Sequence, residues 1–324
     1  MANNINFGKI YDSTWWGVGV TSNNINWGKS YLDLAGGGDE RFIISVKTDN
    51  AGTSATNQFT LPTNTSGITQ DFLYDIETSD GQTITGLTSG TTITFPTAGT
   101  YDIFISGSFP RCYFNNVGDK DKLLYIKNFG IYALGSTSQL SAFWGCSNMV
   151  ISATDIGHFE NVTNFNSAWT NCQSLTSFPL LDTSSVTSFR FAWLSCTSLT
   201  SFPLIDTSSG TDFTYAWSFC SSLTSFPLIN TSSSTSFQQT WDNCSSLTSF
   251  PANAFDDNIA SNYSRSFEDT NLTTQSIDDI LVSLVASGVN NGTFNQSRGQ
   301  GPSATGQTAI ATLTNRGWTI TTTA

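Results

Sequence analysis

Hydrophobic residues recur with a period of 24 across residues 165–251, and the polar residues between them are mostly Ser, Thr and Asn. Each period repeats one order: Phe, then Trp four positions later, Cys three later, Leu three later and Phe-Pro three later. An imperfect earlier copy holds Trp144 and Cys146, and a degraded later copy holds Phe267. Such repetition is typical of chains that stack one unit on the next. The regular tryptophans and cysteines are Trp169, Trp193, Trp217 and Trp241, and Cys172, Cys196, Cys220 and Cys244.

The repeat predicts a leucine-rich-repeat solenoid, because a period of 24 lies within the roughly 20–29 residues of that class. The segment "LTSFPL" fits the pattern L-x-x-L-x-L, with Leu175, Phe178 and Leu180 expected to face inward. Each rung should supply a short parallel strand, a turn at "DTSS" and a short helical or irregular return. Tryptophans of adjacent rungs would lie over one another, since neighbouring strands are about 4.8 Å apart. Proline cannot donate to a sheet ladder, so each Phe-Pro is expected where a strand ends.

The chain outside the regular repeats divides into three further parts. Residues 41–113 contain β-branched and aromatic runs separated by turn residues, which predicts a small antiparallel β-sandwich of the Ig or PKD type. The solenoid, with its N-terminal cap, is expected over residues 114–275. Residues 276–324 predict a C-terminal helical cap, in which Ser276 is the N-cap of a first helix that ends at Gly288. A second short helix and a final strand follow.

The chain carries few charges, and most of them are acidic. Charged residues make up 11% of the 324 residues and the net charge is −12, whereas ordinary globular domains contain about 25% charged residues. Nucleic acid and anionic lipid are recognised by clustered Lys and Arg, so neither is an expected partner. No apolar run is long enough for a transmembrane helix, and the N-terminus lacks the pattern of a secretory signal peptide. We expect a protein released by lysis, such as a phage structural protein, or a mature fragment that has lost its signal.

Residues 1–40 form an aromatic and glycine-rich arm. Two copies of the pattern Ile-Asn-aromatic-Gly-Lys begin at Ile5 and Ile25. So short an arm cannot build a core of its own, so its aromatic residues should pack against something else. We expect it either to anchor the chain on other virion proteins or to pack back on its own domain. The candidate anchoring residues are Phe7, Trp15, Trp16 and Trp27.

The residues that most often carry chemistry indicate structural roles here. The six cysteines are expected to be free and buried, although their even number makes disulfides conceivable, and a line of cysteines does not suit a tetrahedral metal site. His158 is the only histidine, with no nucleophile beside it. Asp182 and Asp206 take the same place in successive rungs, followed by Asn230; they are expected to cap turns, with calcium binding as the alternative. We therefore predict no catalytic residue, no metal and no cofactor.

Two surfaces of the expected stack are candidates for partner binding. The first consists of positions around each tryptophan whose identity changes from rung to rung, although a tolerant outer face would vary in the same way. The second is the strand face, where rows of hydroxyls suit hydrogen bonding to polysaccharides. Candidates on the first surface are Arg190, Phe191, Thr214, Tyr215, Phe219, Gln238, Gln239 and Asp242, and those on the second are Ser177, Ser201 and Ser225.

The pattern W-x-x-C-x-S-L-T-S-F-P resembles the BspA-type leucine-rich-repeat surface proteins, which are found on bacterial surfaces and encoded by phages. The lead-in "GTYDIFISGSFPRCYFNNVGDKDKLLYIKNFG" and the tail "IDDILVSLVASGVNNGTFNQ" are similar to the segments that flank the repeats in that family. The resemblance covers roughly residues 41–324. The tryptophan that relatives often carry before the Asp-Gly of the β-domain is absent from "ETSDGQ". The resemblance implies adhesion or receptor recognition and no catalysis.

The expected function is that of a non-enzymatic phage virion protein on the particle surface. As a tail fibre or capsid-attached adhesin it would bind a host surface glycan or protein through its solenoid, in several copies or as a homo-oligomer. The alternatives are a structural decoration protein that stabilises the virion, a bacterial surface adhesin, and a polysaccharide-degrading enzyme. The enzyme would need a pair of carboxylates in a groove, and acidic residues are sparse in the rungs.

Overall fold

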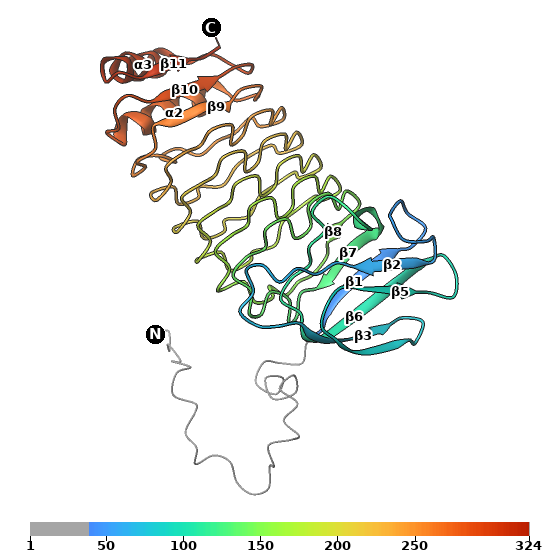
Figure 1. The fold of residues 1–324 in the computed structure, drawn as a ribbon. Coiled ribbons are helices and arrows are strands. Elements are labelled where there is room, and N and C mark those ends of the chain that lie inside the picture. The colour runs from blue at the N-terminus through green and yellow to red at the C-terminus, as the bar shows by residue number, and fades with distance from the viewer. Residues whose placement is uncertain (1–38, 324) are drawn as a thin grey trace, which may run out of the picture. The chain divides into compact units, whose positions relative to one another are not determined.

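The structure is a computed structural model that describes residues 39–323. The predicted anchoring residues Phe7, Trp15, Trp16 and Trp27 lie outside the described residues. From Asp39 onward the chain forms one compact unit, which is mainly β with two short α-helices in its described part. The mainly-β class predicted from the sequence is therefore confirmed. Figure 1 shows β-sheets, then stacked turns of chain, then the helices.

Two sheets form the first part of this unit. The larger sheet has six strands in the order β4-β3-β6-β1-β7-β8, and β2 pairs with β5 in the smaller one. Side chains of β3 alternate between exposed and buried, so one face of the larger sheet packs on a core. All the strands expected in residues 41–113 are present, and β4 is additional. The bounds are β1 Phe42–Lys47, β2 Gln58–Leu61, β3 Leu73–Thr78, β4 Thr83–Leu87, β5 Thr91–Thr94 and β6 Thr100–Ser108.

The larger sheet continues past residue 113 into the stacked part of the chain. A 3₁₀ turn, η4 (Lys120–Lys122), leads into β7 (Leu123–Asn128), which pairs antiparallel with β1. Strand β7 also pairs in parallel with β8 (Val150–Ile151), so the sheet and the first rung share backbone hydrogen bonds. The inner strand β1 needs partners on both edges, and β7 satisfies the groups that β6 does not reach.

The rungs contain turns and short parallel bridges instead of long strands or helices. One row of parallel bridges joins Asn164, Ser188, Asp212 and Ser236, just before each tryptophan. The segment "LTSFPL" is bonded more sparsely, for example from Thr200 N to Thr176 O at 3.1 Å. The return through each tryptophan consists of successive tight turns, in which a backbone N–H bonds to the carbonyl three residues earlier.

The last leucine of "LTSFPL" was predicted to face inward, and this is wrong. Leu180, Leu204 and Leu228 are 60%, 61% and 50% exposed, and the next residue of each rung is buried instead. The cause is a tight bend: the N–H of that buried residue bonds to the carbonyl of the proline two positions earlier, at 3.0 Å in each of the three rungs. The bend starts at the proline and interrupts the alternation of a strand.

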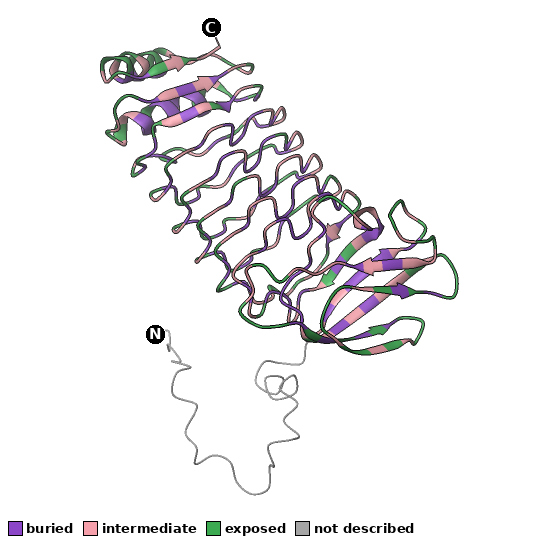
Figure 2. Cartoon of the chain, viewed as in Figure 1, coloured by how far each residue is buried: buried purple, intermediate pink, exposed green. Residues whose placement is uncertain are grey.

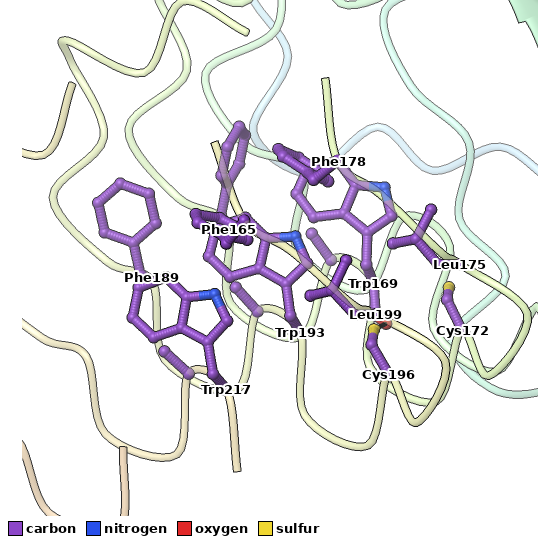
Figure 3. Close-up of a cluster of buried hydrophobic side chains, with 14 of the residues drawn as sticks. Phe165, Trp169, Cys172, Leu175, Phe178, Phe189, Trp193, Cys196, Leu199 and Trp217 are labelled. Atoms are coloured by element: carbon purple, nitrogen blue, oxygen red, sulfur yellow. Dashed lines mark hydrogen bonds between the residues drawn. The ribbon is translucent and has the colours of Figure 1, made fainter. Parts of the chain in front are cut away.

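The core of the rungs is a ladder of stacked aromatic rings, which Figure 3 shows for three tryptophans. The ring centroids of Trp169 and Trp193 are 5.8 Å apart, and the next two steps are 5.2 Å and 6.0 Å, with ring planes within 9° of parallel. Phe178 packs edge-to-face against both Trp169 and Trp193. Phe143 continues the ladder below Trp169, and Phe267 continues it above the last tryptophan. All four tryptophans, Trp169, Trp193, Trp217 and Trp241, are fully buried.

The six cysteines are free and buried, as predicted. In the ladder each thiol donates to a carbonyl of the preceding rung, for example from Cys196 Sγ to Trp169 O at 3.2 Å. Burial raises the pKa of Cys196 well above its ordinary value. A buried thiol of this kind is chemically inert, so the cysteines serve as small packing residues. Cys172, Cys220 and Cys244 make the same contact.

Two helices and a parallel three-stranded sheet end the described chain. Strand β9 (Asn262–Phe267) continues the row of bridges from Ser236, and it is followed by α2 (Thr274–Ala286). The N-cap of α2 is Thr273 and not the predicted Ser276, because the Ser276 hydroxyl accepts a hydrogen bond from Phe250 N at 3.1 Å instead. The remaining elements are β10 Thr293–Gln296, α3 Ala304–Asn315 and β11 Thr319–Thr321.

Gly288 follows the end of α2 with a φ of +74°, as expected for a residue just past a helix C-cap. Figure 2 shows that buried and exposed residues alternate along the rungs. Among residues 39–323, no helix combines the length and apolar character needed to cross a bilayer.

Candidate recognition surface

The turns around the tryptophans create the surface that varies between rungs. In each turn two residues that are not glycine hold a positive φ, for example Phe191 at +56° and Ser195 at +60°. Their N–H groups and that of Trp193 all bond forward to carbonyls of the next rung, at 2.8–3.0 Å. The indole and the thiol of each rung are buried, whereas the second residue with a positive φ, which lies between them, stays accessible in every rung. We call this surface the turn face.

The turn face does not expose all of the candidates. Thr214, Gln239 and Asp242 are only 7%, 8% and 1% exposed, so the prediction that they are displayed is wrong. The carboxylate of Asp242 accepts hydrogen bonds from Gln239 Nε2 at 3.1 Å and from Asn243 Nδ2 at 2.9 Å. Burial raises the pKa of Asp242 above its ordinary value, although these two hydrogen bonds act to lower it. Thr214 occupies the place of Arg190 and Gln238 in adjacent rungs, with a shorter side chain.

Five of the candidates, Arg190, Phe191, Tyr215, Phe219 and Gln238, remain accessible, and the first three of them are in contact. The rings of Phe191 and Tyr215 lie with their centroids 5.1 Å apart and their planes at 32°. The guanidinium of Arg190 stands 4.7 Å from the centroid of Phe191, and its Nη1 is 4.0 Å from Asp212 Oδ2. We call Arg190, Phe191 and Tyr215 the aromatic patch. Phe219, four residues after Tyr215, is 46% exposed.

Sequence reasoning missed Arg265, which lies at the other end of the turn face. Its side chain is 50% exposed, its Nε donates to Glu268 Oε2 at 2.7 Å, and its Nη2 is 3.7 Å from Asp242 Oδ2. A usable signal was present, because Arg190 and Arg265 are the only Lys or Arg residues of the sequence between 152 and 275. The 24-residue period does not reveal where Arg265 lies, because Trp241 and Phe267, which stack, are 26 residues apart.

The strand face carries hydroxyls and an apolar row. Ser177, Ser201 and Ser225 are exposed as predicted. The adjacent threonine hydroxyls donate to the backbone of the preceding rung, for example from Thr200 Oγ1 to Thr176 O at 3.2 Å. The exposed leucines of the proline bends form a second row, which Ile156 extends downward. We call Ile156, Leu180, Leu204 and Leu228 the leucine row.

Titratable groups are scattered in this part of the chain. Within residues 39–323 no three His, Cys, Asp or Glu side chains come close enough to hold a metal ion. His158 is half-buried, and its Nδ1 is 3.8 Å from Glu160 Oε1. Asp182 and Asp206 accept backbone N–H groups two residues later, at 3.1 Å and 2.9 Å, which is the predicted turn-capping role. Asn230 does the same at 3.0 Å.

A shallow hollow of about 350 Å³ lies between α2 and α3, lined by Val282, Val285, Thr305, Thr308, Ala309 and Thr312. Its lining holds no ionisable side chain, so it offers no acid or base. The turn face is therefore the surface on which side chains of several kinds gather on a rigid frame.

Comparison of the chain with family models, with curated proteins and with solved structures gave no match.

Proposed function

We propose that the chain is a non-enzymatic phage virion protein whose repeats form a solenoid of the leucine-rich-repeat class and bind the host cell surface. It would act as a tail fibre or as a capsid-attached adhesin, present in several copies. The arm of residues 1–40 would join it to other virion proteins. The resemblance of the repeats to BspA-type surface proteins supports the adhesive role.

The observation that carries the proposal is the contrast between the ladder and the turn face. The tryptophan, cysteine and proline positions are occupied by the same residue in all four rungs, while the turn-face positions change at every rung. Arg190, Phe191 and Tyr215 are held on that frame, where the backbone of each rung is bonded to its neighbours. A surface of this kind is pre-organised, so little conformational entropy is lost when a partner binds.

The proposal is tested with fluorescently labelled protein and intact host bacteria. We expect saturable binding of the full chain, and a loss of binding when Phe191 and Tyr215 are both replaced by serine. Serine already occupies the equivalent place at residue 167, so the double variant should fold. Thr200→Ala on the strand face is the matched control and should bind as the parent does. Absence of saturable binding by the parent chain would contradict the adhesin role.

The anchoring role of the arm needs a separate test. Deletion of residues 1–38, which keeps the bonds of Asp39 to Arg41 and of Glu40 to Ile131, should abolish incorporation of the chain into particles and leave the folding of the remainder intact. Particles that carry the truncated chain at the parent level would contradict that role. Circular dichroism of the purified truncated chain supplies the control for folding.

A decoration protein that stabilises the virion is the second candidate, and the leucine row favours it. Four large apolar side chains at 50–61% exposure in one row are unusual for a surface with no partner. This function predicts high copy number, no binding of the purified chain to host cells, and particles that lose heat stability when Leu204 is replaced by serine. Host-cell binding with unchanged particle stability would rule it out.

A further inference from the structure

We propose that the aromatic patch is a carbohydrate-binding platform for an uncharged glycan. The inference rests on the proposed recognition function and names the class of ligand for the turn face. Arg190, Phe191 and Tyr215 form its centre. Three features carry the inference: the backbone conformation of the aromatic residues, their exposure, and the balance of charge around them.

The first feature is that aromatic residues occupy positions where the backbone disfavours them. Phe191, Tyr215 and Phe219 hold φ values of +56°, +58° and +60°. A left-handed conformation costs a residue with a bulky side chain roughly 1–2 kcal/mol, and Asn or Gly adopts it more readily. Other rungs place small or amide residues at these positions, such as Ser167 and Asn243.

The second feature is that these rings gain little from burial. Phe191 and Tyr215 are only half-buried and Phe219 is 46% exposed, whereas every tryptophan of the ladder is fully buried. The core therefore does not explain why the rings are present. Strained residues that packing does not require point to a functional site. The paired rings of Phe191 and Tyr215 present an apolar surface to the solvent.

The third feature is the balance of charge on the turn face, both at the patch and at its other end. Arg190 lies against Phe191 and also faces Asp212, while Arg265 lies between Glu268 and Asp242. Each arginine is thus matched by a carboxylate, so the patch offers hydrogen-bond donors and acceptors without a net positive field. A sugar ring has an apolar C–H face and a rim of hydroxyls. The C–H face suits the aromatic rings, and the hydroxyls suit the guanidinium and carboxylate groups.

Other classes of ligand fit the patch less well. Single-stranded nucleic acid also stacks on aromatic rings, but its phosphates require a basic groove, and the chain has a net charge of −12. A stable protein partner needs about 800 Å² on each side, which is far more than two paired rings and one arginine provide. An acidic glycan would meet Asp212 beside the patch. An uncharged glycan needs neither a basic groove nor a large interface, and the carboxylates do not repel it.

The test is affinity electrophoresis of the full chain in native gels that contain one polysaccharide each. Neutral probes are mannan, galactan, dextran and soluble cellulose, and acidic probes are alginate and hyaluronan. We expect at least one neutral polysaccharide to retard the chain. Phe191→Ser with Tyr215→Ser should weaken retardation at least about tenfold, as the loss of two aromatic contacts implies. Arg190→Asn, which copies Asn166 of the preceding rung, should weaken it too.

Thr200→Ala on the strand face is the matched control and should be retarded like the parent chain. Retardation by acidic polysaccharides alone would overturn the uncharged class, and retardation unchanged in the double variant would overturn the patch. If no probe retards the parent chain, the inference fails, and the labelled-cell assay then decides whether the adhesin role fails with it. Loss of cell binding after protease, but not after periodate, would assign the adhesion to a protein and overturn the glycan.

Discussion

The tryptophan ladder buries indole N–H groups without an acceptor, and this leads to an unusual prediction for stability. Nε1 of Trp217 is buried and has no hydrogen-bond partner among residues 39–323, and the same holds for the other three tryptophans of the ladder. Trp318 provides a contrast within the same chain. It is 4% exposed, and its Nε1 donates to Val289 O at 2.9 Å. We compare Trp217→Phe with Trp318→Phe.

The two substitutions remove the same atoms, but they affect the free energy of unfolding differently. Only the Trp318 indole has a hydrogen-bond acceptor. A phenyl ring in place of an indole loses roughly 50 Å² of buried area, which costs about 1.3 kcal/mol at 25 cal/mol per Å². At Trp217 the change also removes a buried donor without an acceptor, a cost of roughly 1–3 kcal/mol in the parent chain. These terms oppose each other, so the net change should lie between a loss of about 0.3 kcal/mol and a gain of about 1.7 kcal/mol in stability.

At Trp318 the two terms have the same sign, because the Val289 carbonyl loses its donor. The expected destabilisation is about 2–4 kcal/mol. Urea unfolding followed by circular dichroism measures both variants against the parent chain. The reasoning is refuted if Trp217→Phe destabilises the chain as much as Trp318→Phe. A Trp217→Ala variant should cost about 3–5 kcal/mol and shows that the assay detects damage to the ladder.

Four further predictions concern other parts of the described chain. Lys122→Met should lower stability by about 3–5 kcal/mol, measured by thermal unfolding, because it leaves the buried carboxylate of Asp119 without its cation. Burial alone would raise the pKa of Asp119, but hydrogen bonds and Lys122 lower it below the ordinary 3.8, so its stabilisation should be complete above about pH 3.8 and fade at lower pH. In thiol labelling with a chromogenic disulfide reagent, Cys196 should not react in the native chain and should react in urea, and native reactivity would contradict its raised pKa. Leu204→Ser should change stability by less than about 0.5 kcal/mol, whereas Ile205→Ser should cost more than about 2 kcal/mol; equal effects would show that the bend is placed wrongly.

The repeat alone was sufficient to predict the order of the ladder. A residue that must stack on a copy of itself cannot change alone, so the period identified Trp193 and Cys196 as inward-facing. The period did not predict which way the residue after each proline would point. Leu204 and Ile205 are both aliphatic, and only the bend from Pro203 decides which one is buried. The residue types alone do not reveal such a bend.

The candidate site was predicted less completely than the core. Variation between rungs identified Arg190, Phe191 and Tyr215, which lie together. It also selected Asp242, which is covered from β9 by Arg265. The contact between Arg265 and Asp242 lies between two rungs that are 26 residues apart. An alignment with a period of 24 is therefore wrong by two residues at this place. The positive φ values of the turns were also hidden, because aromatic residues there give no signal of a left-handed backbone.

The lower and upper faces of an inner rung are near copies of each other, which has a consequence for the gene. Trp193 meets the same indole below and above, and its backbone makes equivalent bonds in both directions. Loss of residues 193–216 by recombination between the coding repeats would join Ala192 to Trp217 and recreate the seam that already exists. Whole copies can therefore be lost or duplicated without a new core. Each event would shift the aromatic patch relative to Arg265 by one rung.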